Sequence, residues 1–167
     1  MDITTKVIEL HPLHQISELF INDSNERFCY VLEDIQRPHG HKVKRWTSLP
    51  RTGMTTWYNV GIRHSPSFGR EMLSISNEPD GVTVRLGGVE FTYPMLHSGN
   101  DNTNTEGCPL VAYEKIDRFV ELDYNGKKIE FQESIIYRQA ETDLFNLVAP
   151  EIRKGEEVRL FMLGLND

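Results

Sequence analysis

Two side chains suited to nucleophilic catalysis, His97 and Cys108, frame the most unusual segment of the chain. Between them the sequence runs SGNDNTNTEG, which contains almost no apolar residue. Such a segment adds little to a hydrophobic core, so its composition indicates that it serves for its backbone shape or its chemistry. A cysteine attacks as the thiolate, and a neighbouring histidine is a common base for that step. We therefore predict that Cys108 is a nucleophile and that His97 accepts its proton.

Three residues near this pair extend the predicted catalytic group. Gly107 lets the backbone approach a substrate closely, and its amide and that of Cys108 are predicted to hold the oxyanion of an attacked carbonyl. Either Glu106 or Asp101 is expected to orient the imidazole of His97, and the residues themselves do not choose between the two.

Two other interpretations of the segment stay open. In the first it is a polar loop, because Asn and Asp side chains readily hydrogen-bond neighbouring backbone groups, and Cys108 is then simply buried. In the second it contributes to a metal site. The potential ligands are His39, His41, His64, His97, Asp101 and Cys108. Since the chain has no CxxC or HExxH motif, and a loop explains the one close pair of histidines, we predict no metal and no other cofactor.

The bulk composition is that of one globular domain spanning residues 1–167. A net charge of −7 argues against a nucleic-acid partner, whose phosphates select clustered Lys and Arg. The first residues lack the pattern of a signal peptide, and no apolar run approaches the roughly 20 residues of a membrane span. We therefore expect synthesis in a cytoplasm and no membrane partner.

The two cysteines are too few for a disulfide framework and have different surroundings. Cys29 lies in the apolar run FCYVL, which predicts a buried, inert thiol. Cys108 lies between a glycine and a proline in a polar context, which predicts a more exposed and reactive thiol.

Short apolar stretches separated by turn signals dominate the chain and predict a mostly β fold. Residues 82–86 and 89–93 flank Gly87-Gly88 and predict a hairpin. Its register places three apolar pairs on one face: Val82–Tyr93, Val84–Phe91 and Leu86–Val89. A second hairpin is predicted to turn at Asn125-Gly126, with Leu122 opposite Ile129 and Val120 opposite Phe131.

The remaining pattern predicts more strands and one helix. Further strands are expected at residues 6–10, 28–33, 56–63, 71–76 and 157–163. Leu144, Leu147 and Val148 recur at helical spacing and predict a helix from about 138 to 149, interrupted by Pro150. The predicted fold class is therefore a single, mostly β domain with one packed C-terminal helix.

An ordered set of motifs resembles an uncharacterised domain family of bacteriophages and bacteria. Members of that family carry L-E-D, a T-x-I-P-x-G-like turn, and H-x-G-N followed by T-x-G-C. The corresponding motifs here are LED at 32–34, TSLPRTG at 47–53, SFG at 67–69, HSGN at 97–100 and TEGC at 105–108. The resemblance extends from about residue 28 to residue 163, and the last two motifs in that order are its most specific part.

That family is in turn similar to the catalytic domain of L,D-transpeptidases. The similarity implies a β-rich sandwich or barrel in which a helix and a closing strand follow the catalytic motif. It implies that Cys108 takes an acyl group from a peptidoglycan stem peptide while His97 serves as the base. The motif residues Asn100, Gly99 and Arg51 are then candidates for binding the substrate.

Two departures from the transpeptidase motif widen the expected chemistry. Glu106 occupies the place of the histidine before Gly-Cys, and Pro109 stands where an Arg or Asn would help to bind substrate. Amide hydrolysis therefore stays open beside transpeptidation. The first hypothesis is a cysteine-dependent enzyme of phage origin that acts on a cell-wall peptide. The alternative is a non-catalytic component of a phage particle, in the tail or baseplate, whose partners are other phage structural proteins.

Overall fold

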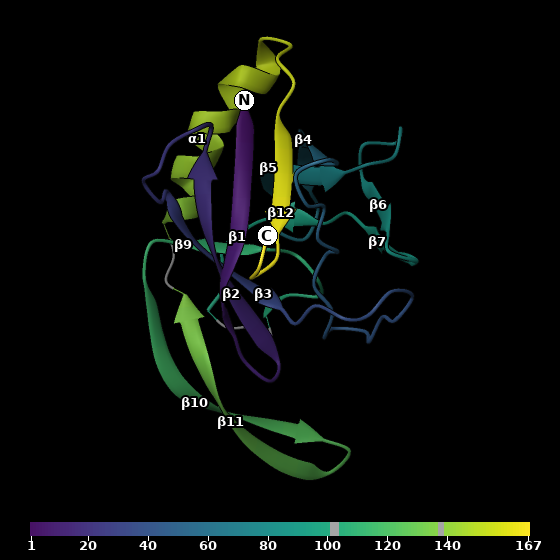
Figure 1. The fold of residues 1–167 in the computed structure, drawn as a ribbon, viewed down its shortest axis with the longest axis vertical. Coiled ribbons are helices and arrows are strands. Elements are labelled where there is room, and N and C mark those ends of the chain that lie inside the picture. The colour runs from purple at the N-terminus through teal and green to yellow at the C-terminus, as the bar shows by residue number, and fades with distance from the viewer. Residues whose placement is uncertain (101–103, 137–138) are drawn as a thin grey trace.

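The computed structural model describes residues 1–100, 104–136 and 139–167, and of residues 116–124 and 129–136 it describes the backbone alone. The described part is rich in β-strands and contains one helix (Figure 1). The elements in chain order are β1 (Asp2–Leu10), β2 (His14–Ile21), β3 (Cys29–Asp34), β4 (Tyr58–Ser65), β5 (Arg70–Ser76), β6 (Thr83–Leu86), β7 (Val89–Thr92), β8 (Met95–Leu96), β9 (Leu110–Ala112), β10 (Lys115–Tyr124), β11 (Lys127–Ile136), α1 (Ala140–Arg153) and β12 (Arg159–Leu163). The predicted mostly β class with one C-terminal helix is confirmed.

Eight of these strands form one strongly curved sheet in the order β8-β5-β4-β12-β1-β2-β3-β9. All its pairings are antiparallel except that of β1 with β12, which joins the first and last strands of the chain in parallel. A parallel bridge between His97 and Leu110 then links the ends of the two edge strands β8 and β9. The sheet is therefore nearly closed into a barrel, and its seam runs beside the predicted catalytic histidine.

Both predicted hairpins are present. In β6–β7, Val84 faces Phe91 and Leu86 faces Val89, as the apolar pattern indicates. The third predicted pair is wrong as an apolar contact, because Tyr93 has a positive φ of 57° and leaves the strand with 51 % of its surface exposed. In β10–β11 the predicted register is confirmed, with positive φ at Asn125 and Gly126, as a type I′ turn requires.

The hydrophobic core lies between the concave side of the sheet and α1, which runs along the sheet in Figure 1. The helix contributes Leu144 and Val148 to this core, whereas the predicted Leu147 is 40 % exposed. Pro150 does not interrupt the helix but lies inside it, and the helix continues to Arg153, with Lys154 and Gly155 following its end. A smaller apolar cluster covers the other side of β2, β3 and β9.

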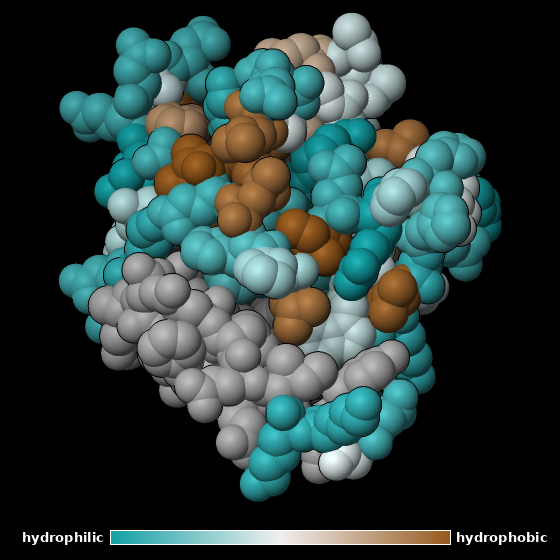
Figure 2. Space-filling view, turned by 60° about the horizontal axis from the view of Figure 1, so that its bottom comes forward, coloured by the Kyte–Doolittle hydropathy of each residue, from teal (hydrophilic) through white to brown (hydrophobic). Residues whose placement is uncertain are grey.

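Figure 2 shows one face of the molecule, on which hydrophobic groups are separated by hydrophilic ones. No helix among the described residues has the length and apolar character needed to cross a bilayer.

Candidate functional site

The seam of the barrel holds His97 and Cys108 on neighbouring segments. The His97 amide donates to the carbonyl of Pro109 at 3.3 Å, and the Val111 amide donates to the carbonyl of His97 at 2.8 Å. Cys108 directly precedes Pro109, so these backbone bonds fix the positions of both residues relative to one another. His97 directly follows β8, and Cys108 and Pro109 directly precede β9.

Both side chains line one open cavity of about 430 Å³. Its other lining residues come from the β4–β5 turn and from the segment around β8: His64, Ser65, Pro66, Ser67, Phe68, Tyr93 and Met95. Phe68, the centre of the SFG motif, packs on His97 with 5.0 Å between ring centroids. Phe68 and Tyr93 are both substantially exposed, at 45 % and 51 %, so they form aromatic walls at the mouth of the cavity.

His97 is held as a neutral base. Its ring is buried, and Nδ1 lies 2.8 Å from the carbonyl oxygen of Ser98. A carbonyl oxygen can only accept, so Nδ1 must carry the proton, which leaves the lone pair on Nε2. Burial lowers the pKa of His97, and this effect outweighs the opposing influences of the Ser98 carbonyl and the Glu141 carboxylate. The imidazole is therefore unprotonated and able to accept a proton near neutral pH.

Cys108 is a partly exposed thiol with one hydrogen-bond donor directed at it. The amide of Met95 donates to Sγ at 3.4 Å, a contact that favours the thiolate. Burial has the larger effect and raises the pKa of the Cys108 thiol, and the carboxylates of Asp34 and Glu106 act in the same direction. In the free protein the sulfur is therefore protonated near neutral pH, and a base is needed to remove the proton.

A tight turn presents Cys108 to the cavity. Thr105 Oγ1 donates to the carbonyl of Cys108 at 2.7 Å and accepts from the Gly107 amide at 3.2 Å. Gly107 has a φ of +116°, and a Cβ atom there would lie 2.6 Å from the ring of Phe91. Glycine is therefore required by both backbone conformation and space. Because the Gly107 amide is already bonded, it does not serve the predicted oxyanion role in this arrangement, whereas no described residue accepts from the Cys108 amide.

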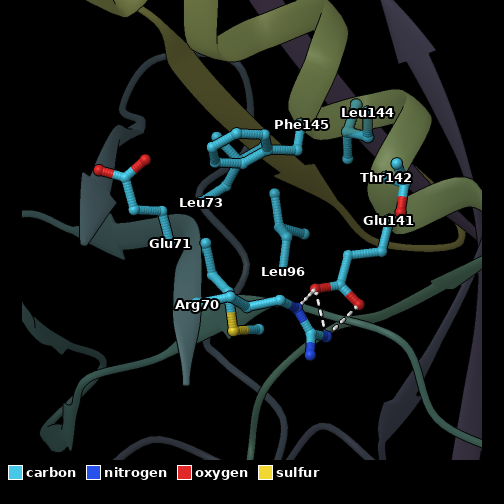
Figure 3. Close-up of a pocket in the computed structure, with 9 residues that line it drawn as sticks. Arg70, Glu71, Leu73, Leu96, Glu141, Thr142, Leu144 and Phe145 are labelled. Carbon is cyan, nitrogen blue, oxygen red and sulfur yellow. Dashed lines mark hydrogen bonds and ion pairs between the residues drawn. The ribbon is translucent and has the colours of Figure 1, made fainter. Parts of the chain in front are cut away.

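A carboxylate that the sequence analysis did not single out lies beside the histidine. Glu141, in the first turn of α1, accepts from the backbone amide of Ser98 at 2.9 Å. It also binds Arg70 of β5 through both carboxylate oxygens, at 2.8 and 2.9 Å, and Figure 3 shows these two side chains meeting beside Leu96. Nothing in the local sequence marks Glu141, because a glutamate in a first helical turn is common.

The remaining predicted site residues lie elsewhere. Glu106 is exposed, and its carboxylate pairs with Arg45 at 2.9 Å. Asp101 lies outside the described residues. Asn100 is exposed, and its amide donates to Asn104 Oδ1 at 2.7 Å, as expected for a polar loop. Gly99 packs against Leu110, where a Cβ atom would lie 2.6 Å from a methyl group.

Arg51 also lies away from the cavity of Cys108. Its guanidinium is buried and contacts both carboxylate oxygens of Glu33, at 2.6 and 3.2 Å. The structure gives no support to the alternative of a metal centre. Among the described residues, no three His, Cys, Asp or Glu side chains are grouped so that they could hold an ion.

Comparison of the chain with protein-family models, with curated proteins and with solved structures gives no match.

Proposed function

We propose that the protein is a cysteine-dependent enzyme that cleaves or transfers the acyl group of an amide, with a peptidoglycan stem peptide as its substrate. The observation that carries the proposal is the shared cavity of Cys108 and His97, in which the Ser98 carbonyl leaves His97 Nε2 as a free proton acceptor. The choice of substrate rests on the resemblance of the HSGN and TEGC motifs to the L,D-transpeptidase motif.

The first half-reaction follows from the protonation states of the two residues. As Cys108 Sγ attacks the substrate carbonyl, its proton moves to His97 Nε2 and a carbon–sulfur bond forms. The Cys108 amide would donate to the oxyanion of the tetrahedral intermediate. The carbon–nitrogen bond then breaks, the imidazolium gives its proton to the leaving amine, and a thioester on Cys108 remains.

The second half-reaction releases the acyl group. Water or a second amine attacks the thioester while His97 Nε2 takes a proton from the attacking group. The carbon–sulfur bond breaks, and the imidazolium returns the proton to the sulfur. Attack by water gives hydrolysis, and attack by an amine gives transpeptidation. The aromatic side chains of Phe68 and Tyr93, which line the same cavity as Cys108 and His97, would contact the bound substrate.

Intact-mass spectrometry of the protein with purified stem tetrapeptides tests the proposal. We expect a thioester adduct on Cys108 and turnover to a shortened or cross-linked peptide. Cys108→Ala should lose both, and His97→Ala should lower turnover by about 100-fold or more, the usual contribution of a general base. Cys29→Ala, which removes the other thiol, should retain activity. Unchanged peptide with the wild-type protein would instead favour the non-catalytic particle component.

A further inference from the structure

A second cavity, of about 280 Å³, lies between the β6–β7 hairpin turn and the segment that carries Arg37. It shares no lining residue with the cavity of Cys108. The polar residues that line it include no Asp or Glu; they are Gln36, Arg37, His39, His41, Thr47, Ser48 and Arg51. In a chain with a net charge of −7, an opening lined in this way is unusual.

Two buried groups at this cavity have no partner among the described residues. Arg51 binds Glu33 through its two terminal nitrogens, which leaves Nε–H without an acceptor. The hydroxyl of Ser48, a residue only 2 % exposed, likewise has no hydrogen bond. A buried donor without a partner costs about 1–3 kcal/mol, so two at one cavity indicate a site that an acceptor from outside would complete.

The donor groups at the cavity determine the sign of the charge that a ligand there would carry. A guanidinium nitrogen can only donate, so Arg51 Nε excludes a cation. Arg37 adds a positive charge: its Nε–H donates to the carbonyl of Trp46 at 3.0 Å, and no described residue accepts a hydrogen bond from its terminal nitrogens. These groups together suit an oxyanion, which accepts several hydrogen bonds and is attracted by the free charge of Arg37.

The apolar residues that line the cavity indicate which kind of molecule would carry the anionic group. Pro38, Pro50, Leu86 and Val89 line the cavity with apolar groups. A hydrophobic lining disfavours a fully hydrated dianion and suits a carboxylate on a short apolar body. We propose that this cavity binds a small carboxylate ligand, with Arg37, Ser48 and Arg51 Nε as its donors.

Titration of ¹⁵N-labelled protein with sodium propionate, followed by NMR, tests this site. We expect the Arg51 Nε–H signal and the Ser48 amide signal to shift on binding. Propionamide has the same shape without the charge and should shift neither signal. Absence of a shift with propionate would overturn the proposal. Tighter binding of inorganic phosphate than of propionate would overturn the choice of a carboxylate.

Two variants separate binding from folding. Arg37→Gln should weaken propionate binding about tenfold, the usual value of one charged hydrogen bond, whereas Lys44→Gln removes a charge from the same loop and should not. Ser48→Ala should weaken binding and at the same time raise the melting temperature of the free protein, because it removes a buried hydroxyl without a partner. Unchanged affinity in Arg37→Gln and Ser48→Ala would contradict the assigned donors.

Discussion

Burial is the main cause of the lowered pKa of His97, and two opposite charges on different elements adjust that pKa. Glu141 of α1 raises the pKa of His97, and Arg70 of β5 lowers it, while burial keeps it below its ordinary value. Glu141→Gln should therefore lower the pKa of His97 further, and Arg70→Gln should raise it. The Cε1–H chemical shift of His97, followed against pH by NMR, measures both effects.

The opposite signs of the two shifts distinguish electrostatic positioning from a loss of structure. A merely structural role for the Arg70–Glu141 pair would move the pKa of His97 in the same direction in both variants, since either change breaks the pair. Glu141 also holds the Ser98 amide, so its loss should lower kcat of the proposed reaction more than it changes KM. Leu147→Gln, on the exposed side of the same helix, serves as a control.

Among the elements, β3 is tied to the following segment by a buried ion pair. Glu33 is fully buried, and it binds Arg51 and accepts a hydrogen bond from Ser17 at 2.9 Å. Glu33→Gln would leave the guanidinium of Arg51 as an uncompensated buried charge, and we expect it to lower the free energy of unfolding by about 3–5 kcal/mol. Urea denaturation measures this loss.

A matched variant shows whether burial is the cause. Glu90→Gln removes a carboxylate that also binds an arginine, Arg85, but in a pair that is more than half exposed on both sides. It should leave the urea midpoint almost unchanged. Equal losses in Glu33→Gln and Glu90→Gln would contradict the argument from burial.

The elements also show what the sequence could and could not predict. Apolar alternation and turn dipeptides were sufficient for both hairpins, because local pattern and register agree there. Strand β2 was not predicted, since its buried positions include the polar residues His14, Gln15 and Ser17, which hide the alternation. The helix continues beyond Pro150 because Ile152 packs against the core, a tertiary contact that no local signal contains.

Only the part of the candidate site that depends on local backbone structure could be predicted from the sequence. The glycine of TEGC and the order of the two motifs indicated a turn that presents Cys108 beside His97. Glu141 and Arg70 meet only because α1 packs against β5. Their contribution to the site therefore could not be predicted from the sequence around either residue. Likewise, Glu106 lies only two residues before Cys108 in the sequence, but its side chain forms an ion pair with Arg45.

At the scale of the whole molecule, buried ionisable groups in the core cause the protein to lose stability at alkaline pH. Burial raises the pKa of the Cys29 thiol from an ordinary value near 9.0 to about 12, and burial also raises the pKa of Tyr58. The native state therefore keeps these protons at a pH where the unfolded chain has lost them. Stability is complete below the ordinary pKa and falls as pH rises above it.

Removal of the Cys29 thiol should reduce this alkaline loss. Between pH 9 and 12 a single such group lowers the free energy of unfolding by about 1.4 kcal/mol per pH unit. Cys29→Ala should weaken the protein at pH 7, because it removes a buried sulfur from the core, and yet should lose stability less steeply than the wild type above pH 9. Urea denaturation at a series of pH values, with reductant present, measures both slopes. Parallel slopes would contradict the raised pKa and would indicate that water reaches the thiol between β2 and β9 in the native barrel.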